Sequence, residues 1–270
     1  MRDTTPTHTY LTSRNNHSLY MLKPSQNINI LSDKFKTGEV AGKAIEDCIV
    51  KLQNTQPFVR IIFAAAPSQD TMLDYLTAST LIDWNRIKAF NMDEYIGLAP
   101  GSEQLFSSYL ERNLFSKVNI PHKRLINPSD TISDELLSYS KIIQEAPIDI
   151  VCLGIGENGH IAFNDPPVAN FKDTESVKVV TLDHACRTQQ VNDKCFNTIE
   201  QVPKRAITLT IPILINANHL FCVVLGKNKS EAVKQTLLGP ITTACPASIL
   251  KEHPNCSFYF DADAYSKINH

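Results

Sequence analysis

The sequence predicts an α/β protein with a doubly wound, mostly parallel sheet, helices on both faces and a single domain. Continuous apolar runs at 59–65, 148–153 and 219–225 are typical of strands that are buried on both faces. Segments with the apolar spacing of helices separate these runs, and strands that alternate with helices form parallel sheets. No linker rich in Gly, Ser or Pro divides the chain, so we expect one domain over 26–270 after a polar N-terminal leader at 1–25.

The first half of this domain alternates regularly between the two kinds of element. Ser32 and Asp33 are suitable N-caps for a helix whose apolar stripe runs from Val40 to Leu52 at helical spacing. The loop 66–70 then joins a buried strand to the next helix. The other elements expected here are strands at 29–31, 59–65 and 87–92 and helices at 71–78, 103–114 and 133–144.

The second half continues the pattern and contains the longest loop. A polar segment at 165–177 follows the strand and turn around residue 160, and its composition is typical of a loop. The elements expected in this half are strands at 148–153, 205–211, 219–225 and 257–261 and helices at 185–196, 230–238 and 247–252.

Composition and charge argue against several classes of protein. With 43% hydrophobic and 20% charged residues the chain can bury a full core, and a net charge of -2 gives no electrostatic reason to expect nucleic acid. No apolar run reaches the ~18 residues of a membrane span, and the polar residues 1–7 lack the apolar core of a signal peptide. The 7 cysteines contain no C-x-x-C pair, which favours buried thiols in a reducing cytosol over a zinc or redox centre. We therefore expect a cytoplasmic protein without a metal site, a nucleic-acid partner or a membrane partner.

Two stretches carry chemistry at the ends of predicted strands. Residues 150–167 run from an apolar strand into a glycine-rich turn that holds His160 beside Asn158 and Asp165. Residues 86–97 contain a second apolar strand, at 87–92, that ends on Asp93 and Glu94. Ligands bind at the carboxyl ends of strands in open α/β sheets, so the carboxylate and the imidazole are a plausible acid–base pair. Taken alone, each stretch is also compatible with an ordinary turn or helix cap.

Three blocks in order make the chain resemble a known family. The blocks are FNMDEY at 90–95, GIGENGHIAFN at 154–164, and PASIL at 246–250 with His253 and Pro254 shortly after. Together they resemble the glucosamine-6-phosphate deaminase (isomerase) family, within the broader group that includes 6-phosphogluconolactonases. The resemblance implies conversion of glucosamine 6-phosphate to fructose 6-phosphate and ammonia, without a cofactor. It also implies a phosphosugar as partner and allows a homo-oligomer.

The resemblance assigns catalytic roles to four residues. Asp93 is the base that moves a proton from C2 to C1 of the open sugar. His160 assists ring opening, because an imidazole both donates and accepts protons near neutral pH. Asp165 and Asn158 hold that imidazole in one orientation, as an acceptor on the second ring nitrogen usually does.

The same resemblance gives a set of substrate-binding residues. Ser68, Arg187 and Lys229 are assigned to the sugar phosphate. Ser68 and Lys229 each lie between a strand and a helix, where backbone N–H groups favour an anion. Glu94 shapes the field around its neighbour Asp93, and Gly159 belongs to the turn that approaches the substrate.

Departures from the family pattern leave alternatives open. The family commonly has aspartate where this chain has Asn158, glutamate where it has Asp165, and glycines where it has Ala66 and Pro67. Pro67 offers no N–H to a phosphate. Another hexosamine 6-phosphate, such as galactosamine 6-phosphate, therefore remains open as the substrate. The alternative functions are a 6-phosphogluconolactonase-like hydrolase and a non-catalytic phosphosugar sensor.

Overall fold

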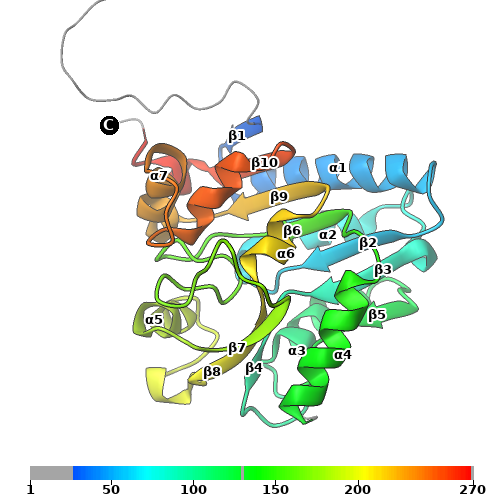
Figure 1. The fold of residues 1–270 in the computed structure, drawn as a ribbon. Coiled ribbons are helices and arrows are strands. Elements are labelled where there is room, and N and C mark those ends of the chain that lie inside the picture. The colour runs from blue at the N-terminus through cyan, green and yellow to red at the C-terminus, as the bar shows by residue number, and fades with distance from the viewer. Residues whose placement is uncertain (1–26, 129–130, 269–270) are drawn as a thin grey trace, which may run out of the picture.

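A parallel sheet of seven strands forms the centre of the molecule (Figure 1). The computed structural model describes residues 27–128 and 131–268, so the leader predicted at 1–25 lies outside the described residues. The strand order is β1-β10-β9-β6-β2-β3-β5, and every neighbouring pair is parallel. These strands are β1 (Asn27–Leu31), β2 (Val59–Phe63), β3 (Ile87–Asn91), β5 (His122–Arg124), β6 (Ile150–Leu153), β9 (His219–Val224) and β10 (Cys256–Asp261). The predicted doubly wound α/β fold is confirmed.

Helices cover both faces of this sheet because alternate residues of each buried strand point to opposite sides. Ile61 and Phe63 of β2 pack in one apolar cluster with α1 and α2, whereas Ile62 packs in the other with α4 and α7. Each face therefore has its own hydrophobic core. The helices are α1 (Lys34–Gln53), α2 (Asp70–Ala78), α3 (Phe106–Leu110), α4 (Ile132–Gln144), α5 (His184–Asn192), α6 (Ile211–Ile215), α7 (Ser230–Leu238) and α8 (Ala262–Tyr265).

A second, smaller sheet lies beside the first and was not expected from the sequence. It consists of β4 (Asp93–Ile96), β8 (Arg205–Leu209) and β7 (Val177–Thr181), paired antiparallel in the order β4-β8-β7. The segment 205–211 was predicted as a strand, but alternation with helices suggested the parallel sheet. Its true partners are more than 100 and about 30 residues away in sequence, and no local pattern reports such pairings. This sheet carries Asp93.

Several short elements also differ from the predictions. The helix expected at 103–114 is an α-helix only over α3 and continues as a π-helical turn at Glu111–Phe115. The helix expected at 247–252 is a 3₁₀ helix over Pro246–Glu252. The elements β5, α6 and α8 were not predicted, because three to five residues are too few to display a period. Asp33 caps α1 as predicted, since its carboxylate accepts from the backbone N–H groups of Phe35 and Lys36.

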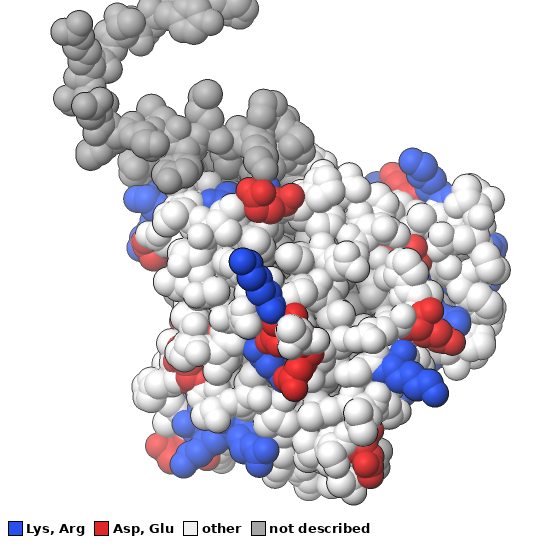
Figure 2. All heavy atoms as spheres, viewed as in Figure 1, with Lys and Arg blue, Asp and Glu red and all other residues white. Residues whose placement is uncertain are grey.

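The surface carries charges of both signs. On the face drawn in Figure 2, Lys and Arg side chains are interspersed with Asp and Glu. Among the described residues, no helix is long and apolar enough to cross a membrane.

Candidate active site

A cavity of about 370 Å³ lies where β2, β6, β9 and β10 of the large sheet end. The backbone that follows β2 and β6 forms part of its wall, as does the turn after β9. Cavities of a few hundred Å³ suit small-molecule ligands. The charged and imidazole side chains that line it are Lys34, Asp70, Asp93, His160, Asp193, Lys229 and Asp261. The structure therefore brings Asp93 and His160, predicted from stretches 67 residues apart in sequence, to one cavity.

The glycines of the turn allow His160 to pack closely on the backbone. A Cβ atom built on Gly156 would lie 2.2 Å from Cε1 of His160, so any side chain there would displace the ring. Gly159 has a φ of +82°, and a Cβ atom there would lie 2.7 Å from Sγ of Cys245. Only glycine combines this backbone conformation with this clearance. Gly159 therefore contributes to the site by allowing the turn to adopt the shape that places His160.

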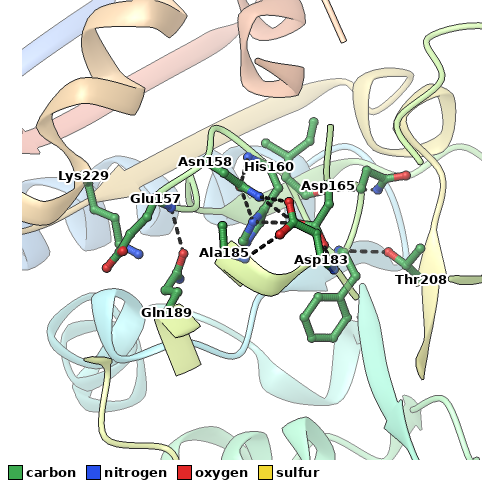
Figure 3. Close-up of polar contacts among 12 residues, drawn as sticks. Glu157, Asn158, His160, Asp165, Asp183, Ala185, Gln189, Thr208 and Lys229 are labelled. Atoms are coloured by element: carbon green, nitrogen blue, oxygen red, sulfur yellow. Dashed lines mark hydrogen bonds and ion pairs between the residues drawn. The ribbon is translucent and has the colours of Figure 1, made fainter. Parts of the chain in front are cut away.

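Two acceptors hold the His160 ring from the side of Nδ1 (Figure 3). Nδ1 lies 2.7 Å from Oδ1 of Asn158 and 3.0 Å from Oδ1 of Asp165. Because both partners are acceptors, they favour the tautomer that carries its proton on Nδ1. The other ring nitrogen, Nε2, has no hydrogen-bond partner within the described part of the chain, and His160 is part of the cavity wall. Nε2 is thus available to a ligand.

Asp165 is fully buried and is surrounded by donors. Burial raises the pKa of its carboxyl, but the hydrogen bond and charge of His160, with hydrogen bonds from Asn158 and the Asp183 backbone, bring it below the usual value. The net direction means that the carboxylate stays ionised beside the imidazole. Asp165, which does not line the cavity, orients His160 from behind.

Asp93 contrasts with Asp165. Its side chain is buried, it lines the cavity, and no described residue donates a hydrogen bond to its carboxylate. Burial raises the pKa of Asp93 well above its usual value, and the nearby charges of Glu94 and Asp165 raise it further. A carboxyl group whose pKa is raised in this way is a stronger base than an ordinary aspartate once it is ionised.

Glu94 does not face the cavity. Successive strand residues point to opposite sides, so the side chain after Asp93 turns away from it. Its carboxylate accepts hydrogen bonds from the backbone N–H groups of Tyr95, Phe106 and Ser107 at 2.8 to 2.9 Å. Glu94 therefore binds the start of α3 and does not line the cavity, and a contact with substrate stays a prediction.

Lys229 contributes a positive charge to the cavity wall, opposite in sign to the carboxylates. Its ammonium is buried and has no hydrogen-bond partner among the described residues, and the nearest carboxylate oxygen, Oδ2 of Asp193, lies 3.8 Å away. Burial lowers the pKa of Lys229, while Asp193 and Glu157 oppose that shift. An unpartnered buried cation is costly, so this group is suited to an anionic ligand.

Ser68 lies near the start of α2 and lines the same cavity. Its Oγ accepts a hydrogen bond from Nε2 of Gln69 at 3.0 Å, which leaves the hydroxyl proton free for a ligand. Together Ser68 and Lys229 form the predicted anion-binding groups that the structure brings to the cavity.

Arg187 lies away from the cavity wall. Its guanidinium donates to the backbone carbonyls of Ile199 and Val202. In this structure Arg187 ties α5 to the following 3₁₀ turn and lies outside the cavity wall, and its phosphate contact stays a prediction. Sequence spacing could not reveal this, because a guanidinium on a long side chain reaches several partners.

Three buried groups offer the atoms that a metal ion would need. The ligand atoms of His160, Asp165 and Cys186 lie within 4.8 Å of one another. However, burial raises the pKa of the Cys186 thiol well above its usual value, and Asp165 raises it further. A thiol must lose its proton to bind a metal. Within this group Asp165 also supports the imidazole, since its Oδ1 lies 3.0 Å from Nδ1 of His160.

The sequence did not indicate several residues of the wall. Gln189, Gln190 and Asp193 reach the cavity from the end of α5, and Asp261 reaches it from the end of β10. Asp261 accepts hydrogen bonds from the N–H groups of Gly226 and Ala264, so it also fixes the turn before Lys229. Only the position of Asp261 at a strand end could have pointed to it.

The fold and the cavity together define an α/β protein with a small-molecule-sized cavity at its strand ends, lined by a carboxylate, an imidazole and a lysine. Residues 32–258 match the family model of glucosamine-6-phosphate isomerases and 6-phosphogluconolactonases. The chain belongs to this family. It is 35% identical over 200 residues to a glucosamine-6-phosphate deaminase of Oenococcus oeni, which covers 74% of this chain and 82% of that one. A deaminase of Clostridium novyi is 39% identical over 191 residues, covering 69% and 77% of the two chains.

Solved structures agree with this assignment. A monomeric glucosamine-6-phosphate deaminase superposes with a TM-score of 0.81 at 26% identity, over 89% of this chain and 99% of that one. The 6-phosphogluconolactonase of Thermotoga maritima has a TM-score of 0.72 at 20% identity, over 87% and 99%, and this likeness concerns the fold alone. By these relatives the chain is a glucosamine-6-phosphate deaminase-like enzyme.

Proposed function

We propose that the protein converts glucosamine 6-phosphate, or a closely related hexosamine 6-phosphate, to a ketose 6-phosphate and ammonia. The observation that carries the proposal is the shared cavity of Asp93, an unpaired buried carboxyl, and His160, an imidazole with a free Nε2. Aldose–ketose isomerisation needs a base at carbon and an acid–base group at oxygen. The names of the relatives support the same reaction.

The proposed steps use these residues in order. The imidazole of His160, through Nε2, passes a proton between the ring oxygen and the anomeric hydroxyl and so opens the sugar. The ionised Asp93 then takes the C2 proton and returns it to C1, while O1 of the aldehyde gains a proton and the C2 ammonium gives up protons as it becomes the imine. The C2 amine leaves as ammonia after hydrolysis of the imine, and Asp165 with Asn158 keeps the imidazole in place throughout. Lys229 and Ser68 bind the phosphate.

Charge in the cavity favours an amino sugar over a lactone. Asp93 lies near the carboxylates of Glu94 and Asp165, which makes its surroundings negative. A protonated C2 amine would be attracted there and would help Asp93 to ionise, since an opposite charge favours the charged form of a carboxyl. A gluconolactone phosphate carries no such cation. For this reason we favour deamination over lactone hydrolysis.

The test is a substrate panel with the full chain. Ammonia release is measured for glucosamine 6-phosphate, galactosamine 6-phosphate and N-acetylglucosamine 6-phosphate, and acid release for 6-phosphogluconolactone. We expect ammonia from one of the two free hexosamine phosphates and the corresponding ketose phosphate by mass spectrometry. Acid release alone would support the lactonase alternative. Binding by calorimetry without any product would support a sensor.

A further inference from the structure

The orientation of Asn158 is fixed by what its two ends contact. Its Oδ1 accepts from the backbone N–H of His160 at 3.1 Å and lies 2.7 Å from Nδ1 of that ring. Its Nδ2 donates to Oδ1 of Asp165 at 3.1 Å and to Oδ2 of Asp183 at 3.4 Å. The amide therefore faces the imidazole with its oxygen because two carboxylates occupy the side of its nitrogen.

Asp183 reaches both of the groups that hold the ring (Figure 3). Its carboxylate accepts from Asn158, and its own backbone N–H donates to Oδ2 of Asp165 at 3.2 Å. Its other carboxylate oxygen caps α5 by accepting from the N–H of Ala185. Asp183 does not line the cavity, so any effect on substrate is indirect.

We propose that Asp183 is a positioning residue for His160, and that its carboxylate and the Asn158 amide form a matched acceptor–donor pair that sets the tautomer of the ring. This inference rests on the proposed function for its effect on turnover. Without the charge of Asp183, only Asp165 holds the amide nitrogen of Asn158, and the amide can turn over more readily to present Nδ2 to Nδ1 of His160. A ring that accepts at Nδ1 carries its proton on Nε2, which changes the group that faces the cavity.

The alternative is that Asp183 acts only as the cap of α5. Asparagine separates the two roles, because it is as good an N-cap as aspartate but carries an amide in place of the charge. In Asp183→Asn, the remaining oxygen continues to cap α5 at Ala185. The new NH₂ group then takes the place of the other oxygen and faces the NH₂ group of Asn158. Two donors then meet where a donor and an acceptor met before.

A reciprocal exchange tests the pairing. Asn158→Asp by itself gathers carboxylates at 158, 165 and 183 and removes the amide donor that lies between Asp165 and Asp183. The double variant Asn158→Asp with Asp183→Asn restores an acceptor–donor pair in the reverse sense, with the acceptor at 158 and the donor at 183. It still loses the bond from position 158 to Asp165, so we expect partial recovery.

Two readouts are needed. The first is kcat and KM on the substrate that the wild-type protein turns over. The second is the tautomer of His160, measured by ¹⁵N NMR of histidine-labelled protein in the absence of substrate, with the signal assigned from the spectrum of His160→Gln. The control Asp83→Asn makes the same substitution at a residue that caps the 3₁₀ turn Trp84–Arg86 and does not line the cavity.

For Asp183→Asn we expect kcat to fall about 10- to 100-fold with little change in KM, the size expected for loss of a hydrogen bond to a charged group. The share of the Nε2–H tautomer should rise, and the double variant should be faster than Asn158→Asp alone. Wild-type kcat and tautomer in Asp183→Asn, or a double variant slower than Asn158→Asp, would overturn the proposal. If the wild-type protein turns over no substrate, the proposed function fails, and the tautomer measurement still decides the positioning role.

Discussion

The turn around His160 and the pair Asp93 and Lys229 line one cavity but differ in how their polar side chains are hydrogen-bonded. In the turn, Asn158 and Asp165 have hydrogen-bond partners on every side, and the imidazole is held by two acceptors. Asp93 and Lys229 are also buried, yet neither has a hydrogen-bond partner among the described residues. A buried polar group without a partner costs stability. The difference indicates which groups orient and which await a ligand.

The largest effect should come from removing the unpaired carboxylate. Asp93→Asn preserves the shape of the side chain but cannot take a proton, and we expect kcat to fall at least about 1000-fold, within the range for loss of a general base. Binding of the substrate, measured by calorimetry, should persist. The matched control Asp70→Asn changes a cavity carboxylate that the Tyr109 hydroxyl already contacts, and its effect on kcat should be smaller. Full turnover by Asp93→Asn would remove this residue from the base role.

Lys229, a buried cation without a hydrogen bond, should matter for binding more than for chemistry. In Lys229→Met the apolar stem remains and the charge is lost, so we expect KM to rise about 10- to 100-fold, as for a lost charged hydrogen bond. The melting temperature should not fall, because an unpartnered buried cation has been removed. Lys227→Met, two residues earlier and exposed, is the control. An unchanged KM in Lys229→Met would show that the phosphate binds elsewhere, for example at Arg187.

The pH profile should reflect the same two groups. The pKa of Asp93 is raised by burial and by Glu94 and Asp165, so the ionised base is lost on acidification at a pH well above the usual range of an aspartate. The pKa of Lys229 is lowered by burial, so its charge is lost on rising pH earlier than that of an ordinary lysine. We expect kcat/KM to rise and then fall over a narrow pH range. Lys229→Arg should move the alkaline limb to higher pH, because a guanidinium stays charged. An acid limb in the usual range of an aspartate would contradict the role of Asp93.

The smallest effect on turnover should come from Glu94, whose carboxylate is fully hydrogen-bonded. Glu94→Gln replaces one acceptor oxygen by an NH₂ group that faces a backbone N–H, so we expect the free energy of unfolding to fall by about 1–3 kcal/mol. KM should change little. Chemical denaturation measures the first quantity, and Glu103→Gln, an exposed residue of the preceding loop, is the control. A rise in KM comparable to that of Lys229→Met would return Glu94 to the substrate site.

The sequence by itself was enough for the outline of the molecule. Apolar runs of strand length and helical spacing determine local structure through burial, so the order of β2, α2, β3 and β6 followed from residues close in sequence. The positions of Asp93 and His160 followed from the same logic, because residues just after parallel strands meet at one edge of the sheet. These conclusions need no knowledge of distant contacts.

Tertiary structure decided what each polar side chain does. The antiparallel sheet joins segments distant in sequence, and it turns Asp93 toward the cavity and its neighbour Glu94 toward α3. Arg187 is a phosphate ligand by resemblance, yet in the fold its guanidinium meets backbone carbonyls. Asp183 gave no signal in the sequence and lies behind the imidazole. The pattern of apolar and polar residues is a local property of the sequence. A hydrogen bond, by contrast, depends on which atoms the folded chain brings within about 3 Å.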